Sequence, residues 1–499
     1  MHTVAGEPLT LTALREVADG APVQIAGAAF EKMAASRAVV DRIIANDEVV
    51  YGITTGFGKL ADVRIPMDRL GELQLNLVRS HACGIGDPLP IEEARGMMLL
   101  RANVLAVGCS GARPVIAETI CAMLNHGVTP VIPEQGSVGA SGDLAPLAHL
   151  ALVLIGEGEA FFNGDRLPGG DAMNRAGIPT ITLEAKEGLA ILNGTQALTS
   201  VGGLAVQRAM SLTKVADIAG AMTLDALRDT PAAFDPRIQS VRPHAGQSVV
   251  AKNLIRLLEG SEIRESHRTG DSRVQDAYSI RCMPQVHGAI RDAIAYVRGV
   301  LEIETGSGTD NPLVFVDTGE VISGGNFHGA PVALALDYAA IAVTDLMSIS
   351  ERRIERMVNP DLSEGLPAFL SPDAGMGSGY MIPQVAAVAL LNESKVLAHP
   401  ASIDNVPTSA GKEDHVSMGM VAATKLRRIV ANAESLLAIE LMAAADALEY
   451  RLPLRTSPRL QKAHSLVRTY SPRLVADRSL SNEITAVAAA IRGGEFDDL

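Results

Sequence analysis

The stretch of residues 136–150, GSVGASGDLAPLAHL, holds the residues best suited to chemistry. Its glycines recur at every third position, so the backbone can adopt conformations that other residues avoid. A phosphate-binding loop would need a Lys-Ser or Lys-Thr pair after the glycines, and none follows them. The pairs Gly58-Lys59 and Gly411-Lys412 fail the same test, so a phosphate loop is excluded.

The tripeptide Ala140-Ser141-Gly142 can cyclise if its loop is strained. The amide nitrogen of Gly142, the least hindered nucleophile, would attack the carbonyl carbon of Ala140, and loss of water would close a five-membered ring. Loss of the Ser141 hydroxyl as a second water would leave an exocyclic methylene. The product would be a 4-methylidene-imidazol-5-one (MIO), an electrophile that needs no metal. A bare Ala-Ser-Gly is usually only a turn, so the surrounding motifs matter.

Those motifs resemble the histidine and aromatic amino-acid ammonia-lyase family over nearly the whole chain. They are YGITTGFG, NLVRSHACGIG, GSVGASGDLAPLAH, LNGTQ, RVQDAYSIRCMPQVHG, TDNPLVF, GGNFHG and NESKVLAHPASIDNVPTSAGKEDHVSMG. The resemblance implies autocatalytic MIO formation and non-oxidative elimination of ammonia from L-histidine, giving trans-urocanate. It also implies a homotetramer with active sites shared between subunits. Gly411-Lys412 departs from the family pattern, where Asn-Gln or a similar pair is expected.

The elimination requires a base within hydrogen-bond reach of the substrate's β-carbon. Tyr51 is the candidate, because it lies in the loop YGITTGFG among glycines instead of on an apolar helical face. The alternative is a tyrosine that packs the loop against the core. The family resemblance favours the catalytic role.

The string RVQDAYSIR places Gln275, Tyr278 and Arg281 at successive three-residue steps. On a helix these three would share a ridge, and a guanidinium there could bind a substrate carboxylate through two parallel hydrogen bonds. The resemblance implies that role for Arg281, with supporting hydrogen bonds from the other two. The alternative is a surface salt bridge beside a buried tyrosine.

Four further residues take roles from the resemblance. Asn193 would hydrogen-bond the electrophile or the substrate amine, although an Asn-Gly turn is the local alternative. Phe327 would pack on the electrophile or the substrate ring, unless it is a core residue. His81 and Glu393 would contact the imidazole, a pairing that a plain phenyl ring could not satisfy. The alternative for His81 is a core histidine whose hydrogen bonds are made within the protein. The alternative for Glu393 is a carboxylate on the solvated face of a helix.

Metal and disulfide chemistry are not indicated. The eleven histidines show no HExxH or other ligand spacing, so we expect no metal site. The four cysteines form no CxxC motif. We expect them to be reduced thiols in a cytoplasmic protein. They are Cys83, Cys109, Cys121 and Cys282.

Long apolar patterns predict a mainly α fold, with a long-helix bundle and a smaller mixed N-terminal region that carries the electrophile loop. We expect the division at residues 1–200 and 201–499. Helices are expected at 70–82, 91–106, 144–158, 197–228, 330–358 and 425–451, and short strands at 129–133, 312–317 and 320–324.

The composition of the chain limits the classes of molecule that it can bind. The net charge of −14 and the absence of Lys/Arg runs argue against a nucleic-acid partner. The longest uncharged stretch, residues 188–207, contains polar residues and glycines and is a poor membrane span. We therefore expect a small-molecule amino-acid substrate and no membrane partner.

Three rivals remain. The first is a tyrosine or phenylalanine ammonia-lyase or 2,3-aminomutase on the same scaffold. The second is a fumarase/aspartase-type lyase, disfavoured because its Gly-Ser-Ser signature loop is absent. The third is a silent helical scaffold that never cyclises the loop.

Overall fold

The computed structural model describes residues 1–58, 62–271 and 273–499, and these form two compact units. Unit 1 comprises residues 1–207, 297–337 and 400–424, and unit 2 comprises residues 208–296, 338–399 and 425–499. The sequence suggested two continuous regions that meet at residue 200. The units are instead discontinuous, because four long helices each contribute residues to both of them.

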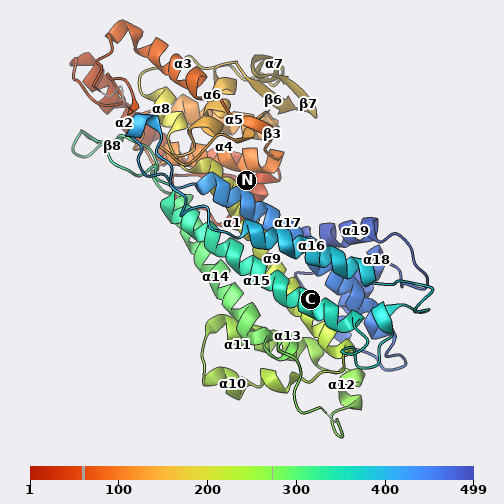
Figure 1. Cartoon of the computed structure of the whole chain (residues 1–499). Helices are drawn as coiled ribbons and strands as arrows, with labels where there is room; N and C mark the ends of the chain where they lie inside the picture. The colour runs from red at the N-terminus through yellow and green to blue at the C-terminus, as the bar shows by residue number, and fades with distance from the viewer. Residues whose placement is uncertain (59–61, 272) are drawn as a thin grey trace. The chain divides into compact units, whose positions relative to one another are not determined.

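The fold is mainly helical, as the sequence predicted, with 58% of residues in helices (Figure 1). Unit 1 contains all the strands of the described residues. Its helices are α1 (Leu11–Ala18), α2 (Gly27–Ala45), α3 (Leu70–His81), α4 (Ile91–Ala106), α5 (Pro114–His126), α6 (Leu144–Leu154), α7 (Gly169–Arg175) and α8 (Glu187–Leu192), with 3-10 turns η2 (Met67–Arg69) and η5 (Ser409–Gly411). Its strands are β1 (His2–Val4), β2 (Val23–Ile25), β3 (Ile85–Pro88), β4 (Thr129–Pro130), β5 (Pro133–Gln135), β6 (Glu159–Phe162), β7 (Asp165–Pro168), β8 (Leu313–Phe315) and β9 (Glu320–Ile322).

The strands pair in small separate sheets. β1 and β2 are parallel, β3 pairs with β5, β8 pairs with β9, and β4, β6 and β7 form an antiparallel sheet in that order. The strands predicted at 129–133, 312–317 and 320–324 correspond to β4 with the start of β5, to β8 and to β9. The β6–β7 hairpin was not predicted.

The helix ends follow local chemistry. α5 begins with Pro114, where a missing N–H costs nothing, and ends before Gly127 in a left-handed conformation at φ 76°. α4 is buried along almost its whole length and packs against α1 and α5. These helices form the support for the loops of unit 1.

Unit 2 contains the helix bundle. The long helices that reach into it are α9 (Gln196–Ala226), α14 (Met283–Glu304), α15 (Ala330–Val358) and α17 (Gly419–Glu449). The shorter elements are η3 (Pro231–Phe234), α10 (Pro236–Ser240), α11 (Ala245–Leu258), α12 (Glu262–Ser266), α13 (Tyr278–Arg281), η4 (Ala368–Leu370), α16 (Met381–Leu397), α18 (Pro458–Tyr470) and α19 (Ser481–Arg492).

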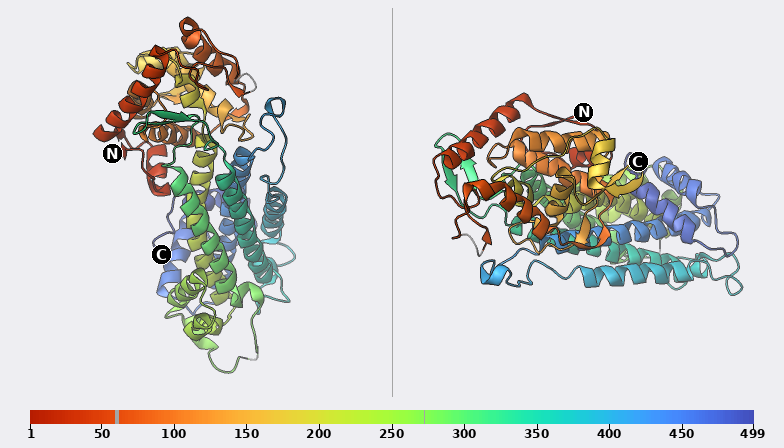
Figure 2. Two further views of the ribbon diagram at one scale, coloured as in Figure 1. Left: turned by 90° about the vertical axis from the view of Figure 1, so that its left-hand side faces the viewer. Right: turned by 90° about the horizontal axis from the view of Figure 1, so that it is seen from above.

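The bundle helices run side by side in unit 2 (Figure 2). A buried polar network links all four: His287 of α14 contacts Asp217 of α9 at 2.9 Å, and Arg353 of α15 pairs with Glu440 of α17. Thr223 of α9 donates to the same Glu440 at 3.0 Å. Buried charges need such pairing, since an isolated ion would be costly to desolvate.

α15 is the one described helix long and apolar enough to cross a membrane by length and composition. However, 72% of its most apolar window is buried within the chain, and the core helix of a globular protein passes the same test.

Candidate active site

The tripeptide Ala140-Ser141-Gly142 lies in a strained loop between β5 and α6. Ser141 has φ 53° and Gly142 has φ 82°, both in the left-handed region. For a serine this conformation costs about 1–2 kcal/mol. The surrounding structure must therefore hold the loop in place.

The loop is pressed directly against residues 193–195. Gly142 forms a parallel bridge with Gly194, and the Asp143 amide donates to the Gly194 carbonyl at 2.7 Å. A Cβ added at Gly142 would lie 2.3 Å from that carbonyl oxygen. Only glycine permits this approach, and it brings Asn193 next to the loop.

Asn193 is buried, with 4% of its surface exposed. Its side-chain Nδ2 donates to the Asn311 carbonyl at 3.2 Å, and its own carbonyl accepts from Arg101 at 2.7 Å. Burial lowers the pKa of Arg101 to about 10, so the guanidinium stays charged at neutral pH. The Asn193 Oδ1 has no hydrogen-bond partner among the described residues. This atom can accept a hydrogen bond from a bound group.

Asp143 fixes the other end of the loop. Its buried carboxyl accepts from the Ser137 hydroxyl at 2.8 Å and from the Leu198 amide at 2.8 Å. The Leu198 amide belongs to the first turn of α9, where helix N–H groups lack partners within the helix. Burial raises the pKa of Asp143 to about 6, against the lowering effect of these hydrogen bonds.

Glu413, to which the sequence gave no role, contacts the loop directly. Its Oε1 accepts from the Ser141 hydroxyl at 2.9 Å, and its Oε2 accepts from Thr408 and Ser409 at 2.7 Å each. Burial raises the pKa of Glu413, but these hydrogen bonds outweigh it and hold the pKa below its usual value. No sequence signal marks this contact, which spans 272 positions.

His81 lies at the end of α3, in the same neighbourhood. A coulombic influence of His81 is the smallest of the causes that act on the lowered pKa of Glu413. Its Nδ1 lies 2.8 Å from the Leu77 carbonyl, which selects the tautomer with hydrogen on Nδ1. That tautomer leaves Nε2 as an acceptor.

Phe327 lies in a turn whose end packs near the loop. A Cβ added at Gly329 would lie 3.0 Å from the Ser417 hydroxyl, and one added at Gly139 would lie 2.0 Å from the same atom. The turn of Phe327 and the Ser141 loop therefore share Ser417 as a neighbour. The Phe327 side chain is half-buried.

Tyr51 lies in a loop that packs against Leu189 and Pro312. Leu189 accepts a hydrogen bond from the Asn193 amide, and Pro312 follows Asn311, whose carbonyl accepts from the Asn193 side chain. A Cβ added at Gly52 would meet side-chain carbons of Leu189 and Pro312, each at 2.9 Å. The Gly58 amide lies 3.5 Å from the Tyr51 hydroxyl. Residues 59–61, which follow this loop, lie outside the described residues.

The other predicted site residues belong to unit 2. α13 begins only at Tyr278, so the predicted helical ridge is wrong for Gln275, which lies in the preceding loop. The cause is Asp276, whose carboxylate accepts from the Thr230 amide at 2.8 Å and holds this stretch outside the helix. The Arg281 guanidinium lies over the Tyr278 ring, 4.4 Å from its centroid.

Glu393, on α16, also lies in unit 2. Its carboxylate accepts from Asn432 at 2.6 Å and from Arg428 at 3.2 Å. These hydrogen bonds lower its pKa. The carboxylate is therefore ionised and already has two partners within unit 2.

The described residues contain no group of three or more His, Cys, Asp or Glu side chains placed to hold a metal ion. The four cysteines are free thiols.

Comparison with known proteins places this geometry in a family. The sequence model of the aromatic amino acid lyase family matches residues 9–469. The chain is 56% identical to a histidine ammonia-lyase of Koribacter versatilis over 99% of this chain and 98% of that protein. It is 55% identical to one of Myxococcus xanthus, over 99% and 97%. The chain belongs to the aromatic amino acid lyase family.

Solved structures of other aromatic amino acid lyases and aminomutases share the fold. A histidine ammonia-lyase from Trypanosoma cruzi superposes with a TM-score of 0.93 at 45% identity, covering 100% of this chain and 94% of that one. A tyrosine aminomutase from Streptomyces globisporus has a TM-score of 0.94 at 38% identity, covering 100% and 98%. The family prediction from the sequence is confirmed.

The raised pKa of Asp143 in this aromatic amino acid lyase predicts a pH-dependent stability. Its folded-state pKa of about 6 exceeds the ordinary 3.8, so its neutral form favours folding. The stability that the neutral Asp143 contributes is complete below pH 3.8, the ordinary pKa that applies in the unfolded chain. It is lost as the pH rises through about 6, which lowers the free energy of unfolding by up to about 3 kcal/mol. Denaturant unfolding across this range should show wild type losing stability relative to Asp143→Asn. A constant difference between the two proteins would contradict the expectation.

Proposed function

We propose that this lyase eliminates ammonia from L-histidine to give trans-urocanate. The observation that carries the proposal is the strained Ala140-Ser141-Gly142 loop, held against Gly194 with its serine hydroxyl bound to Glu413. The identity of 52–56% to histidine ammonia-lyases over nearly the whole chain supports histidine as the substrate.

We propose that the tripeptide cyclises to MIO without a metal. The Gly142 nitrogen bonds to the Ala140 carbonyl carbon, whose oxygen leaves as water, and Ser141 loses its hydroxyl and its Cα hydrogen as a second water. The residues present fit this group, because Ser141 and Gly142 both have left-handed φ angles and the Asn193 Oδ1 has no hydrogen-bond partner among the described residues. The ring, once formed, supplies an electrophile that takes up the substrate's amine and makes nitrogen a better leaving group.

Tyr51 is the proposed base for the β-proton. Its loop packs through Gly52 on Leu189 and Pro312, which flank the segments that hold Asn193. Asn193 would orient the reacting groups by hydrogen bonds, since its amide is fixed by Asn311 and its Oδ1 has no other described partner.

The substrate-binding roles follow the sequence prediction. Arg281 would bind the carboxylate, with Tyr278 and Gln275 as supporting hydrogen-bond partners. His81 and Glu393 would recognise the imidazole, and Phe327 would pack against the ring. A polar pair of this kind favours imidazole over phenyl, because a plain ring would leave buried polar groups without partners.

The alternative of a tyrosine or phenylalanine ammonia-lyase or 2,3-aminomutase on the same scaffold is not favoured, because the similarity to the Streptomyces globisporus tyrosine aminomutase reaches only 38% identity. The higher identity to histidine ammonia-lyases supports histidine instead.

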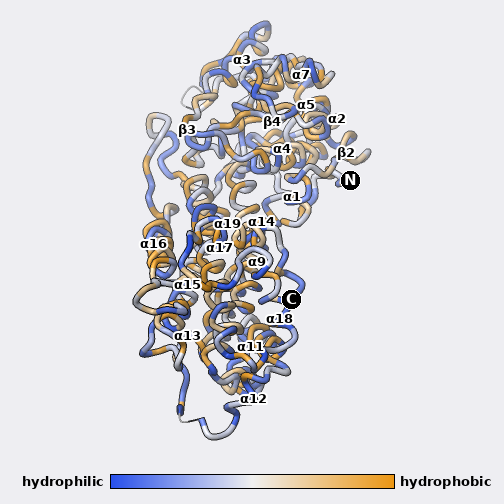
Figure 3. Tube along the Cα trace, turned by 90° about the vertical axis from the view of Figure 1, so that its right-hand side faces the viewer, coloured by the Kyte–Doolittle hydropathy of each residue, from blue (hydrophilic) through white to orange (hydrophobic). Residues whose placement is uncertain are grey.

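We further propose a cytoplasmic homotetramer with shared active sites. α16 exposes apolar side chains, and much of its trace has the colour of hydrophobic residues in Figure 3. They are Met381, Ile382, Val385, Val388 and Val396, exposed by 37–71%. Exposed apolar surface of this kind is typical of an interaction site, and four free thiols suit a reducing compartment.

The reaction and the electrophile are tested together. Purified wild type should convert histidine to a product with urocanate absorbance, faster than it converts tyrosine or phenylalanine, and its intact mass should lack two waters. Ser141→Ala should keep the fold but lose both the mass deficit and the turnover. Faster conversion of tyrosine or phenylalanine would sink the substrate assignment, and an unmodified mass in active protein would sink the electrophile.

Tyr51→Phe should lower kcat by about 10²- to 10⁴-fold, the usual contribution of a general base, with a small effect on KM. Tyr296→Phe, a change to an exposed tyrosine of α14, is the matched control and should leave kcat unchanged. Steady-state rates on fully matured protein check this, and near-normal kcat in Tyr51→Phe would remove the residue from the mechanism.

Light scattering should give four chain masses for wild type. Ile382→Glu should weaken the association, because a charge would be buried in the apolar interface. Val475→Glu places the same charge at an exposed valine outside α16 and should leave the tetramer intact. A monomeric wild type would contradict the assembly.

A further inference from the structure

The segment of residues 273–281 in unit 2 carries three of the proposed substrate-binding residues, Gln275, Tyr278 and Arg281. Tyr278 is 71% exposed. The Arg281 Nε has no hydrogen-bond partner among the described residues, and the guanidinium rests on the Tyr278 ring. The orientation of these side chains therefore depends on how the backbone of the segment is held.

The first anchor is the carboxyl end of α9. Arg228 follows the helix with φ 57°. The Arg228 amide donates to the Asp225 carbonyl, and the Asp229 amide donates to the Leu224 carbonyl. This is the Schellman pattern, with an arginine where glycine is usual. The Arg273 guanidinium donates to the carbonyls of Leu227 and Arg228 at this end. A cation suits this position, because the carboxyl end of a helix carries partial negative charge.

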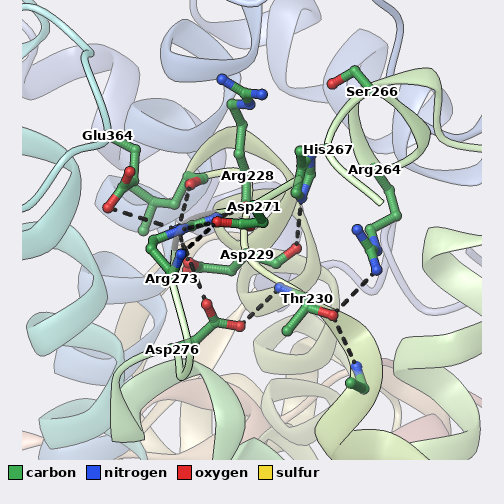
Figure 4. Close-up of polar contacts among 12 residues, drawn as sticks. Arg228, Asp229, Thr230, Arg264, Ser266, His267, Asp271, Arg273, Asp276 and Glu364 are labelled. Atoms are coloured by element: carbon green, nitrogen blue, oxygen red, sulfur yellow. Dashed lines mark hydrogen bonds and ion pairs between the residues drawn. The ribbon is translucent and has the colours of Figure 1, made fainter. Parts of the chain in front are cut away.

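Arg273 also gathers carboxylates from separate stretches of chain, as Figure 4 shows. Its Nη1 lies 2.7 Å from a carboxylate oxygen of Asp229, 3.7 Å from one of Glu364 and 3.9 Å from one of Asp276. Its Nη2 lies 3.0 Å from a carboxylate oxygen of Asp271. Only a planar, branched donor can contact so many acceptors at once.

Removing this cation would leave Asp229 and Asp276 facing each other. Both side chains are almost fully buried. The pKa of Asp229 is raised to about 8, first by burial and then by Asp276, and Arg273 opposes both. The cation thus keeps two carboxyl groups together, and that of Asp276 accepts from the Thr230 amide and so fixes the segment at residue 276.

The second anchor lies at α13. The Arg353 guanidinium donates to the Ser279 carbonyl at 3.4 Å, and Arg353 is itself fixed between Glu440 and His287. The segment is thus tied at residues 273, 276 and 279, and Tyr278 and Arg281 lie beside the last tie.

We propose that Arg273 is a positioning residue that holds the segment 273–281 in the geometry in which Arg281 binds the substrate carboxylate. This inference rests on the proposed function, which assigns the carboxylate to Arg281. Arg273 touches no substrate and acts through the backbone of the segment.

The test compares two ligands that differ in the group at issue. The ligand 3-(imidazol-4-yl)propionate keeps the carboxylate and lacks the amine, whereas histamine keeps the amine and lacks the carboxylate. In Arg273→Gln, inhibition by the propionate should weaken about tenfold and KM for histidine should rise about tenfold, as expected for lost ground-state binding. Inhibition by histamine and the mass deficit at residues 140–142 should stay unchanged.

Arg273→Lys keeps the positive charge but lacks the branched guanidinium, and it should recover part of the inhibition by the propionate. If Arg273→Gln folds poorly, Arg273→Lys still tests the proposal. Arg268→Gln is the matched control. This arginine precedes the segment along the chain and, among the described residues, forms an ion pair only with Glu265 at the surface, so both inhibitors should bind its variant as they bind wild type.

Equal weakening of both inhibitors in Arg273→Gln and Arg273→Lys would overturn the positioning role, because it would indicate a general loss of structure. Unchanged propionate inhibition would overturn it as well. A wild type that does not turn over histidine would instead overturn the proposed function, so the two failures are distinguishable.

Discussion

The close approach of two backbone stretches at Gly142 and Gly194 is the constraint on which the candidate site depends. No side chain fits between them, since a Cβ at either position would meet atoms less than 3 Å away. The contact fixes Asn193 beside the loop and allows Asp143 to bind the first turn of α9. A strained serine can persist there because the neighbouring contacts determine its position.

Buried charged groups form ion pairs at two places where a loop must be held. Lys186 pairs with Asp310 at 2.8 Å with both side chains fully buried, and Asp310 also binds the amide of Asn311, whose carbonyl holds Asn193. Arg273 has the same function in unit 2. Buried pairs add little net stability, because desolvation offsets the attraction. We infer that their value here is a fixed geometry.

Regular elements were largely predictable. The apolar spacing of residues 91–106 gave the bounds of α4, and that of residues 330–358 gave those of α15. The β6–β7 hairpin was missed, although Asn163-Gly164 at its turn is a strong hairpin signal, with both residues at positive φ. The ridge through Gln275 was wrong, because a tertiary hydrogen bond from Thr230 overrode the helical spacing.

The sequence by itself determined the tripeptide able to cyclise and the faces of the long helices, because both depend on residues that are neighbours along the chain. Only the tertiary structure decided that Glu413 meets Ser141 and that Arg273 joins the end of α9 to the segment before α13. Such contacts join residues far apart in the chain, and their partners are selected by packing, which local spacing does not encode.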